Sequence, residues 1–110
     1  MPFIVITSHA WSLPSGGQLT NDGVRVYRYS VEPEETVTGS LVAIGVYCHE
    51  YGHVLGLPDL YDTDYSSSGV GEWCLMSGGS WNYAPGQEPG ASPAHLLAWC
   101  KAQLGWVNPA

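Results

Sequence analysis

Basic residues are scarce in this 110-residue chain, which has only Arg25, Arg28 and Lys101 against ten acidic residues. The formal net charge is therefore −7 at pH 7. Without a basic stripe, the chain cannot neutralise a run of phosphates, so we expect no nucleic-acid partner. A partnership with anionic membranes is disfavoured for the same reason. An acidic chain does attract cations, and this favours a metal-binding protein.

Long hydrophobic runs are also absent. The longest, around Leu41–Cys48, is far too short to cross a bilayer, so no membrane-spanning helix is expected. The N-terminal sequence MPFIVIT has neither a positive leader nor a small-residue cleavage site, which predicts that no signal peptide is present. Its abrupt apolar start suggests that the sequence begins inside a domain.

Cysteine is limited to Cys48, Cys74 and Cys100. An odd and sparse count is not a disulfide framework, so cysteine usage leaves the redox compartment open. Cys74 and Cys100 could pair, although nothing in the sequence requires it. Cys48 is expected to be a small buried side chain.

The hydrophobic fraction of 45% is that of a globular protein, and the length fits one domain or a piece of one. A chain this short buries only about two thirds of its unfolded surface. Its core is therefore small, and a bound metal or a further segment would matter for stability.

The first half of the chain predicts two strands. The short apolar run Phe3–Thr7 is of strand type, and Val24–Val31 is rich in β-branched and aromatic residues. Between them, Trp11–Gly23 is rich in Gly, Pro, Ser and Asn, which indicates a loop or a hairpin connection.

Two helices are predicted in the second half. The first covers Leu41–Leu55 with Ser40 as its N-cap, and Gly56 followed by Pro58 ends it. The second covers Pro93–Leu104 with Ser92 as its N-cap and Gly105 as its end. The long loop between them, residues 58–93, is of a length that is usually functional or held by a metal.

The stretch CHEYGHVLGLPD concentrates titratable groups in the first of these helices. Residues four apart share a helix face, so His49 and His53 project side by side and can bind one zinc ion. Glu50 lies about 100° from His49 and about 60° from His53 around the helix. It is therefore placed where a general base can take a proton from a water that the metal activates.

Glycines support this interpretation. Gly45 and Gly52 lie within about 60° of His49 on the helix. Each costs roughly 0.5–1 kcal/mol relative to alanine, which is best explained by something that packs closely there. Gly56 permits a left-handed turn that can return Asp59 to the metal as a third, oxygen ligand.

A family resemblance follows from these residues. HEYGHVLGLPD is similar to the extended zinc motif HExxHxxGxxD, a variant of the metzincin pattern with Asp as the last ligand. HEYGHVLGLPDLYDTD followed by EWCLMSGGSW closely resembles the immune inhibitor A family of secreted bacterial metallopeptidases. The likeness also includes SHAWSL, YSVEPE and KAQLGW, so it covers roughly residues 9–106.

The resemblance implies a secreted zinc endopeptidase that cleaves proteins or peptides. In it, His49, His53 and Asp59 are zinc ligands, Glu50 is the general base, and Met76 lies in a Met-turn below the metal. The family's catalytic domains are longer and follow a propeptide, so residues 1–110 would be one domain that is the C-terminal portion of such a catalytic domain, with propeptide and accessory domains in the full-length protein. More distantly related thermolysin-like enzymes use a glutamate from a later helix as the third ligand, which leaves the role of Asp59 open.

Other titratable residues have alternative roles. Glu88 or His95 could complete the metal site in place of Asp59, although surface or capping roles suit both. Asp62 and Asp64 could bind calcium, but such residues more often cap turns. Tyr61 and Tyr83 are candidate donors to an oxyanion, with aromatic packing as the simpler role.

The expected fold is α+β, a zincin- or metzincin-like catalytic domain fragment. It has a small sheet that backs an active-site helix, a Met-containing loop and a short C-terminal helix. The alternative function is a non-catalytic, zinc-stabilised binding module or an inactive fragment of a protease. An enzyme keeps an open coordination position, whereas a structural zinc site is closed by four protein ligands.

Overall fold

The computed structural model describes residues 7–109. Its first part is a long two-stranded ribbon, in which β1 (His9–Ser12) pairs antiparallel with β4 (Arg28–Val31). The ribbon continues beyond a short turn as β2 (Gln18–Leu19) and β3 (Arg25–Val26), which also pair antiparallel. The predicted strand at 24–31 is thus present, with a break between β3 and β4.

The rest of the first half differs from the prediction in two ways. Of the predicted strand Phe3–Thr7, residues 3–6 lie outside the described residues, and Thr7 is in no strand. Trp11–Gly23, predicted as a loop or a hairpin connection, does connect the two sides of the ribbon, but it is not all loop, because β1 includes Trp11 and Ser12 and β2 lies farther along the same segment. Backbone pairing with 25–31 recruits these residues despite their Gly- and Ser-rich surroundings.

Helix α1 (Ile44–Val54) begins later than predicted, and Ser40 is not its N-cap. The backbone before it is engaged elsewhere: Leu41 forms a bridge with Glu35, and the Val42 N–H donates to the Glu34 carbonyl. No side chain caps α1. Instead the N–H of Gly45 donates to the carbonyl of Gly90 at 2.9 Å, so the long loop caps the helix.

The close packing expected at the two helix glycines is confirmed. A Cβ on Gly45 would lie 1.9 Å from the Ser80 carbonyl oxygen, and one on Gly52 would lie 2.4 Å from the Met76 sulfur. Gly56 adopts φ of 104°, the left-handed turn that ends the helix. The segment after α1 therefore packs tightly against the helix at both glycines.

The last helix is also shorter than predicted. α2 covers Ala98–Gln103 instead of 93–104, and neither Ser92 nor Pro93 belongs to it. Residues before it are extended because their backbone bonds to the preceding loop: Ala94 N–H donates to the Gly79 carbonyl, and the His95 carbonyl accepts from Leu75. Gly105, with φ of 71°, ends α2 as expected.

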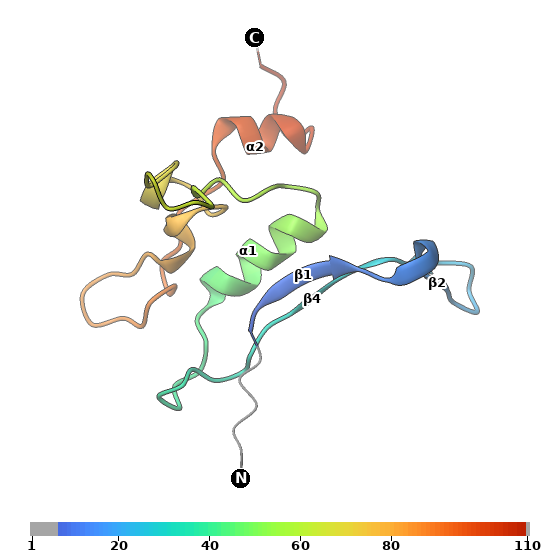
Figure 1. The fold of residues 1–110 in the computed structure, drawn as a ribbon, viewed down its shortest axis with the longest axis horizontal. Coiled ribbons are helices and arrows are strands. Elements are labelled where there is room, and N and C mark those ends of the chain that lie inside the picture. Colours follow the sequence, from blue (N-terminus) through green and yellow to red (C-terminus); the bar gives the residue numbers. More distant parts are fainter. Residues whose placement is uncertain (1–6, 110) are drawn as a thin grey trace.

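Helix α1 lies between the ribbon and the second half of the chain (Figure 1). On the ribbon side it contacts β1 and β4. On the other side it contacts the 3₁₀ helix Gly78–Trp81, which itself packs against the 3₁₀ helix Gly71–Trp73. The fold is α+β in this coarse sense, with a small sheet beside one central helix.

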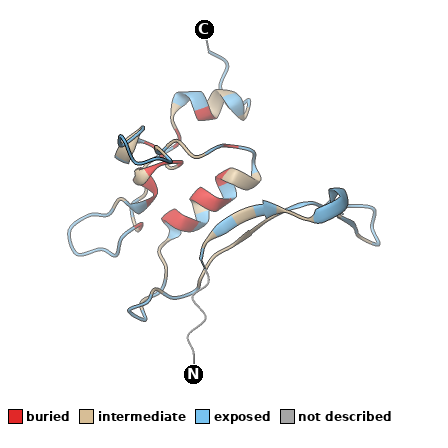
Figure 2. Cartoon of the chain, in the orientation of Figure 1, coloured by how far each residue is buried: buried red, intermediate tan, exposed pale blue. Residues whose placement is uncertain are grey.

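The core is small and lies on the side of α1 away from the ribbon. Figure 2 shows the buried residues along α1 and in the segments that face it. The buried apolar cluster is Leu57, Cys74, Met76, Leu96 and Cys100. The radius of gyration is 16.0 Å, compared with about 13 Å for a compact domain of this length. Among the described residues, no helix is long and apolar enough to span a membrane.

Candidate metal centre

Helix α1 places its two histidines one turn apart on the same face. Their rings are perpendicular with centroids 4.8 Å apart, and the Nε2 atoms of His49 and His53 are separated by 3.2 Å. His49 is buried, whereas His53 is half-buried. The spacing expected from the i, i+4 pattern is thus present, with both ring tips directed to one point.

Backbone carbonyls orient both rings. The Nδ1 atom of His49 lies 2.8 Å from the Leu75 carbonyl oxygen, and that of His53 lies 2.8 Å from the Leu57 carbonyl oxygen. A carbonyl oxygen only accepts hydrogen bonds, so we infer that each Nδ1 carries the proton. In the neutral form of each ring, Nε2 is then the unprotonated nitrogen, which is the one that can bind a metal.

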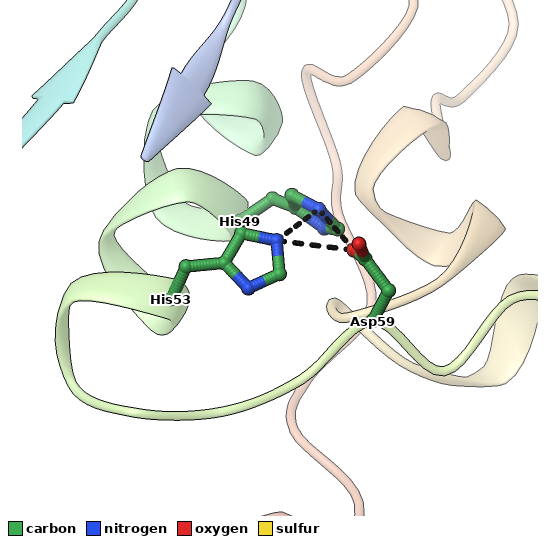
Figure 3. A group of neighbouring side chains, drawn as sticks. All are labelled: His49, His53 and Asp59. Carbon is green, nitrogen blue, oxygen red and sulfur yellow. Dashed lines mark hydrogen bonds and ion pairs between the residues drawn. The ribbon is translucent and has the colours of Figure 1, made fainter. Parts of the chain in front are cut away.

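Asp59 completes the group (Figure 3). Its Oδ1 atom lies 3.1 Å from Nε2 of His49 and 3.0 Å from Nε2 of His53. This oxygen is buried and accepts no hydrogen bond. The turn after α1 makes the approach possible, because the Leu57 N–H reaches back to the Gly52 carbonyl and reverses the chain.

The three atoms fit one metal ion. When both rings are neutral, lone pairs of both Nε2 atoms and of Oδ1 converge on one point, an arrangement that a cation stabilises. Donor atoms around a tetrahedral zinc with bonds of about 2.0–2.1 Å lie about 3.3 Å apart, close to the observed 3.0–3.2 Å. Among the His, Cys, Asp and Glu side chains of residues 7–109, His49, His53 and Asp59 form the group whose ligand atoms lie close enough together to share one ion.

Tyr61 holds the other oxygen of Asp59. Its hydroxyl donates to Oδ2 at 2.9 Å, and its ring stacks on that of His49 with an interplanar angle of 18°. The hydrogen bond to Asp59, followed by burial and the Asp59 charge, raises the pKa of Tyr61 to about 12. The hydroxyl therefore stays protonated at neutral pH and leaves Oδ1 free to face the histidines.

Glu50 lies on α1 between the two histidines in sequence and is only 6% exposed. A buried carboxylate next to a candidate metal centre is suited to proton transfer.

Met76 lies beneath the histidine helix. It is fully buried, and its sulfur packs at Gly52, one position before His53. The preceding residue, Leu75, provides the carbonyl that orients His49. The Met76 carbonyl accepts from the N–H of Leu60, next to Asp59, so this segment is joined to both sides of the site.

The alternative third ligands do not reach the site. Glu88 is exposed on the long loop, and neither it nor His95 belongs to the group of gathered ligand atoms. His95 is exposed, and its Nδ1 lies 3.4 Å from the carbonyl oxygen of its neighbour Leu96. Of the three candidates from sequence, Asp59 is the one that the structure brings to the histidines.

The loop that contains Asp62 and Asp64 has no feature that supports the calcium site considered from the sequence. Asp62 accepts hydrogen bonds from the backbone or hydroxyls of Asp64, Ser66 and Ser67, and these bonds hold its pKa well below the usual range. Asp64 accepts from the Ser66 N–H. The carboxylate of Asp62 thus organises the turn, which is the capping role.

A groove of about 580 Å³ lies beside the candidate centre. It is formed by the ribbon, which contributes Trp11 and Arg28, and by the end of α1 and the following turn, which contribute His53 and Asp59. Tyr83 lies elsewhere, in a cavity of about 490 Å³ whose walls also include Glu72 and Trp81.

Sequence reasoning did not identify the groups that position the site. The Leu57 and Leu75 carbonyls carry no side-chain signal. Arg28 donates from Nη1 to the Val54 carbonyl at 2.9 Å and to the His53 carbonyl at 3.4 Å, which ties the ribbon to the end of α1. A cation near the C-terminus of a helix is favourable. The chain has only three basic residues, so Arg28 was one of few candidates for that position.

Two histidines on one helix, a buried glutamate between them and a carboxylate returned by a glycine turn define a metallopeptidase-type site. The chain belongs to the immune inhibitor A peptidase M6 family, because the sequence model of that family's catalytic domain matches residues 6–107. The resemblance inferred from the sequence is thereby confirmed.

Curated relatives agree with this assignment. The chain is 38% identical over 96 residues to the pre-pro-metalloprotease PrtV of two Vibrio cholerae serotype O1 strains, a match that covers 80% of this chain and 10% of the relative. It is 51% identical over 57 residues to immune inhibitor A of Bacillus thuringiensis subsp. alesti, covering 50% of this chain and 7% of the relative. The chain thus spans about a tenth or less of the relatives' length. No solved structure matches it significantly.

Proposed function

We propose that this chain is the zinc-binding part of an endopeptidase, with His49, His53 and Asp59 as metal ligands and Glu50 as general base. The observation that carries the proposal is the convergence of Nε2, Nε2 and Oδ1 within 3.2 Å of one another, next to a buried glutamate. Membership in a metallopeptidase family supports it.

The donor set favours zinc and a catalytic role. Two imidazole nitrogens and one carboxylate oxygen are typical of catalytic zinc sites, which use three protein ligands and leave a position open. A structural site would need a fourth protein ligand, and the gathered group among residues 7–109 has three members. This favours the enzyme over the non-catalytic binding module. Bound zinc would supply Lewis acidity, which polarises a peptide carbonyl and acidifies water.

The chain's own residues would perform the proton transfers and hold the substrate. Glu50 would take a proton from the attacking water and return it to the leaving amine. The groove between the ribbon and α1 would hold the peptide, since Trp11 offers an exposed apolar face and Arg28 a positive charge beside His53 and Asp59. Met76 would serve as the Met-turn residue, a role supported by its burial under α1 at Gly52.

The wider protein is part of the same proposal. We propose that residues 1–110 form the C-terminal portion of a metzincin-like catalytic domain in a longer, secreted protein with a propeptide and accessory domains. Support comes from the large apolar side chains left exposed, such as Trp73 at 80% and Trp11 at 72%, and from the much greater length of the relatives, of which the match to PrtV covers 10%. Proteins or peptides would be the substrates.

Metal analysis combined with casein digestion tests the function. The complete protein that carries this chain is expected to contain one zinc per chain and to digest casein. A chelator should stop digestion, and added zinc should restore it. Zinc without any digestion of casein or peptide libraries would instead support the binding module, and absence of zinc would remove the proposal altogether.

Replacing Tyr61 with Phe is expected to weaken zinc binding about 10-fold. The change removes only the hydroxyl that holds Oδ2 of Asp59, and loss of a group that orients a ligand typically costs 10–100-fold in metal affinity. Zinc affinity should be measured by competition with a chromophoric chelator. The matched control is Tyr83→Phe, a tyrosine in the other cavity. Equal affinities in both variants would show that Tyr61 does not position Asp59.

A further inference from the structure

Two of the three cysteines meet in the buried core. Cys74 and Cys100 are 26 positions apart in the sequence, yet their sulfur atoms lie 3.9 Å from each other. Both residues are fully buried at 0% exposure. Cys74 precedes Leu75 and Met76, the segment under α1, whereas Cys100 belongs to α2.

The third cysteine is separate from this pair. Cys48 is half-buried on α1, and among the described residues the close pair of thiols is Cys74 and Cys100, not Cys48. The two buried thiols are packed by apolar neighbours such as Leu57 and Leu96. Each of the two buried thiols therefore has the other within contact distance.

We propose that Cys74 and Cys100 form a disulfide bond once the protein meets an oxidant. Both are reduced in the structure described. The reaction joins the two sulfurs, and the two thiols lose two protons and two electrons. A small-molecule disulfide such as oxidised glutathione accepts the electrons and is released as two thiols, through a mixed disulfide at one cysteine.

The bond would connect α2 to the segment that supports the histidines. Leu75, the neighbour of Cys74, provides the carbonyl that orients His49. Crosslinking across 26 positions also removes loop-closure entropy from the unfolded chain. The apolar core of this chain is small, so such a crosslink would add substantially to its stability.

The environment indicates when the bond forms. Burial raises the pKa of Cys100, and the nearby Cys74 adds to the shift. The reactive thiolate is therefore scarce in the folded protein at neutral pH. We expect oxidation to be slow in the folded state and fast during folding, when both thiols are exposed to the oxidant.

The test is a thiol map of the complete protein, refolded with reduced and oxidised glutathione. Remaining thiols are alkylated under denaturing conditions, and peptides are identified by mass spectrometry without reduction. The expected result is a Cys74–Cys100 crosslink with Cys48 alkylated. Alkylation of both Cys74 and Cys100, or a crosslink that involves Cys48, would overturn the proposal.

Thermal unfolding provides a second readout. Reduction with a phosphine should lower the Tm of the oxidised wild type by on the order of 10 °C. The double variant C74A/C100A should show no such reduction-dependent shift, and C48A should keep it. A shift that persists in the double variant would contradict the assignment. If the double variant does not fold, the thiol map of the wild type decides.

Discussion

Replacing Glu50 with Gln is expected to lower the turnover of peptide hydrolysis by about 10²–10⁴-fold while the zinc content of the protein stays the same. Gln has the size of Glu and fits the same buried position, which is 6% exposed. It keeps one acceptor oxygen but cannot take a proton from the attacking water. The loss should therefore appear in kcat, measured with a fluorogenic peptide beside zinc analysis of the same sample.

Glu88→Gln is the matched control for this variant. It makes the same chemical change at an exposed glutamate of the long loop, outside the candidate centre. Its zinc content and kcat should equal those of the wild type. If Glu50→Gln lost zinc, Glu50 would be a structural or ligating residue. If it kept full activity in the complete protein, the mechanism would be wrong.

Replacing His53 with Ala should release the zinc and destabilise the fold. The change removes one of three converging donors, so the remaining Nε2 and Oδ1 atoms bind a metal much more weakly. A ligand that binds only the folded state at 100 times its Kd stabilises it by about 2.7 kcal/mol, and that contribution disappears with the metal. Urea unfolding with and without zinc measures the difference.

His95→Ala serves as the control for the histidine change. His95 is exposed and lies outside the gathered ligand atoms, and only its backbone carbonyl takes part in the bond with Leu75. Its zinc content and zinc-dependent stabilisation should match those of the wild type. If His53→Ala were instead stabilised by zinc as much as the wild type is, His53 would not be a ligand.

Much of the fold was predictable where neighbouring residues decide the conformation. The β-branched run before Pro33 forms β3 and β4, and Gly56 and Gly105 end the helices at the expected positions. The starts of both helices were not predictable. Before α1, Leu41 and Val42 pair with Glu35 and Glu34 in the preceding turn, and before α2 the backbone of residues 94 and 95 bonds to the distant Gly79 and Leu75. These pairings outside the helices prevail over a local N-cap signal.

By itself, the sequence determined the i, i+4 spacing of His49 and His53 and the glycine turn that leads to Asp59, because both depend on residues within one helical turn or one chain reversal. Only the tertiary structure decided which third candidate approaches the histidines and which nitrogen of each ring carries the proton. The Leu75 carbonyl acts on His49 from 26 positions away, and Cys74 meets Cys100 across the same separation. Such contacts arise from packing of distant segments, which local spacing does not encode.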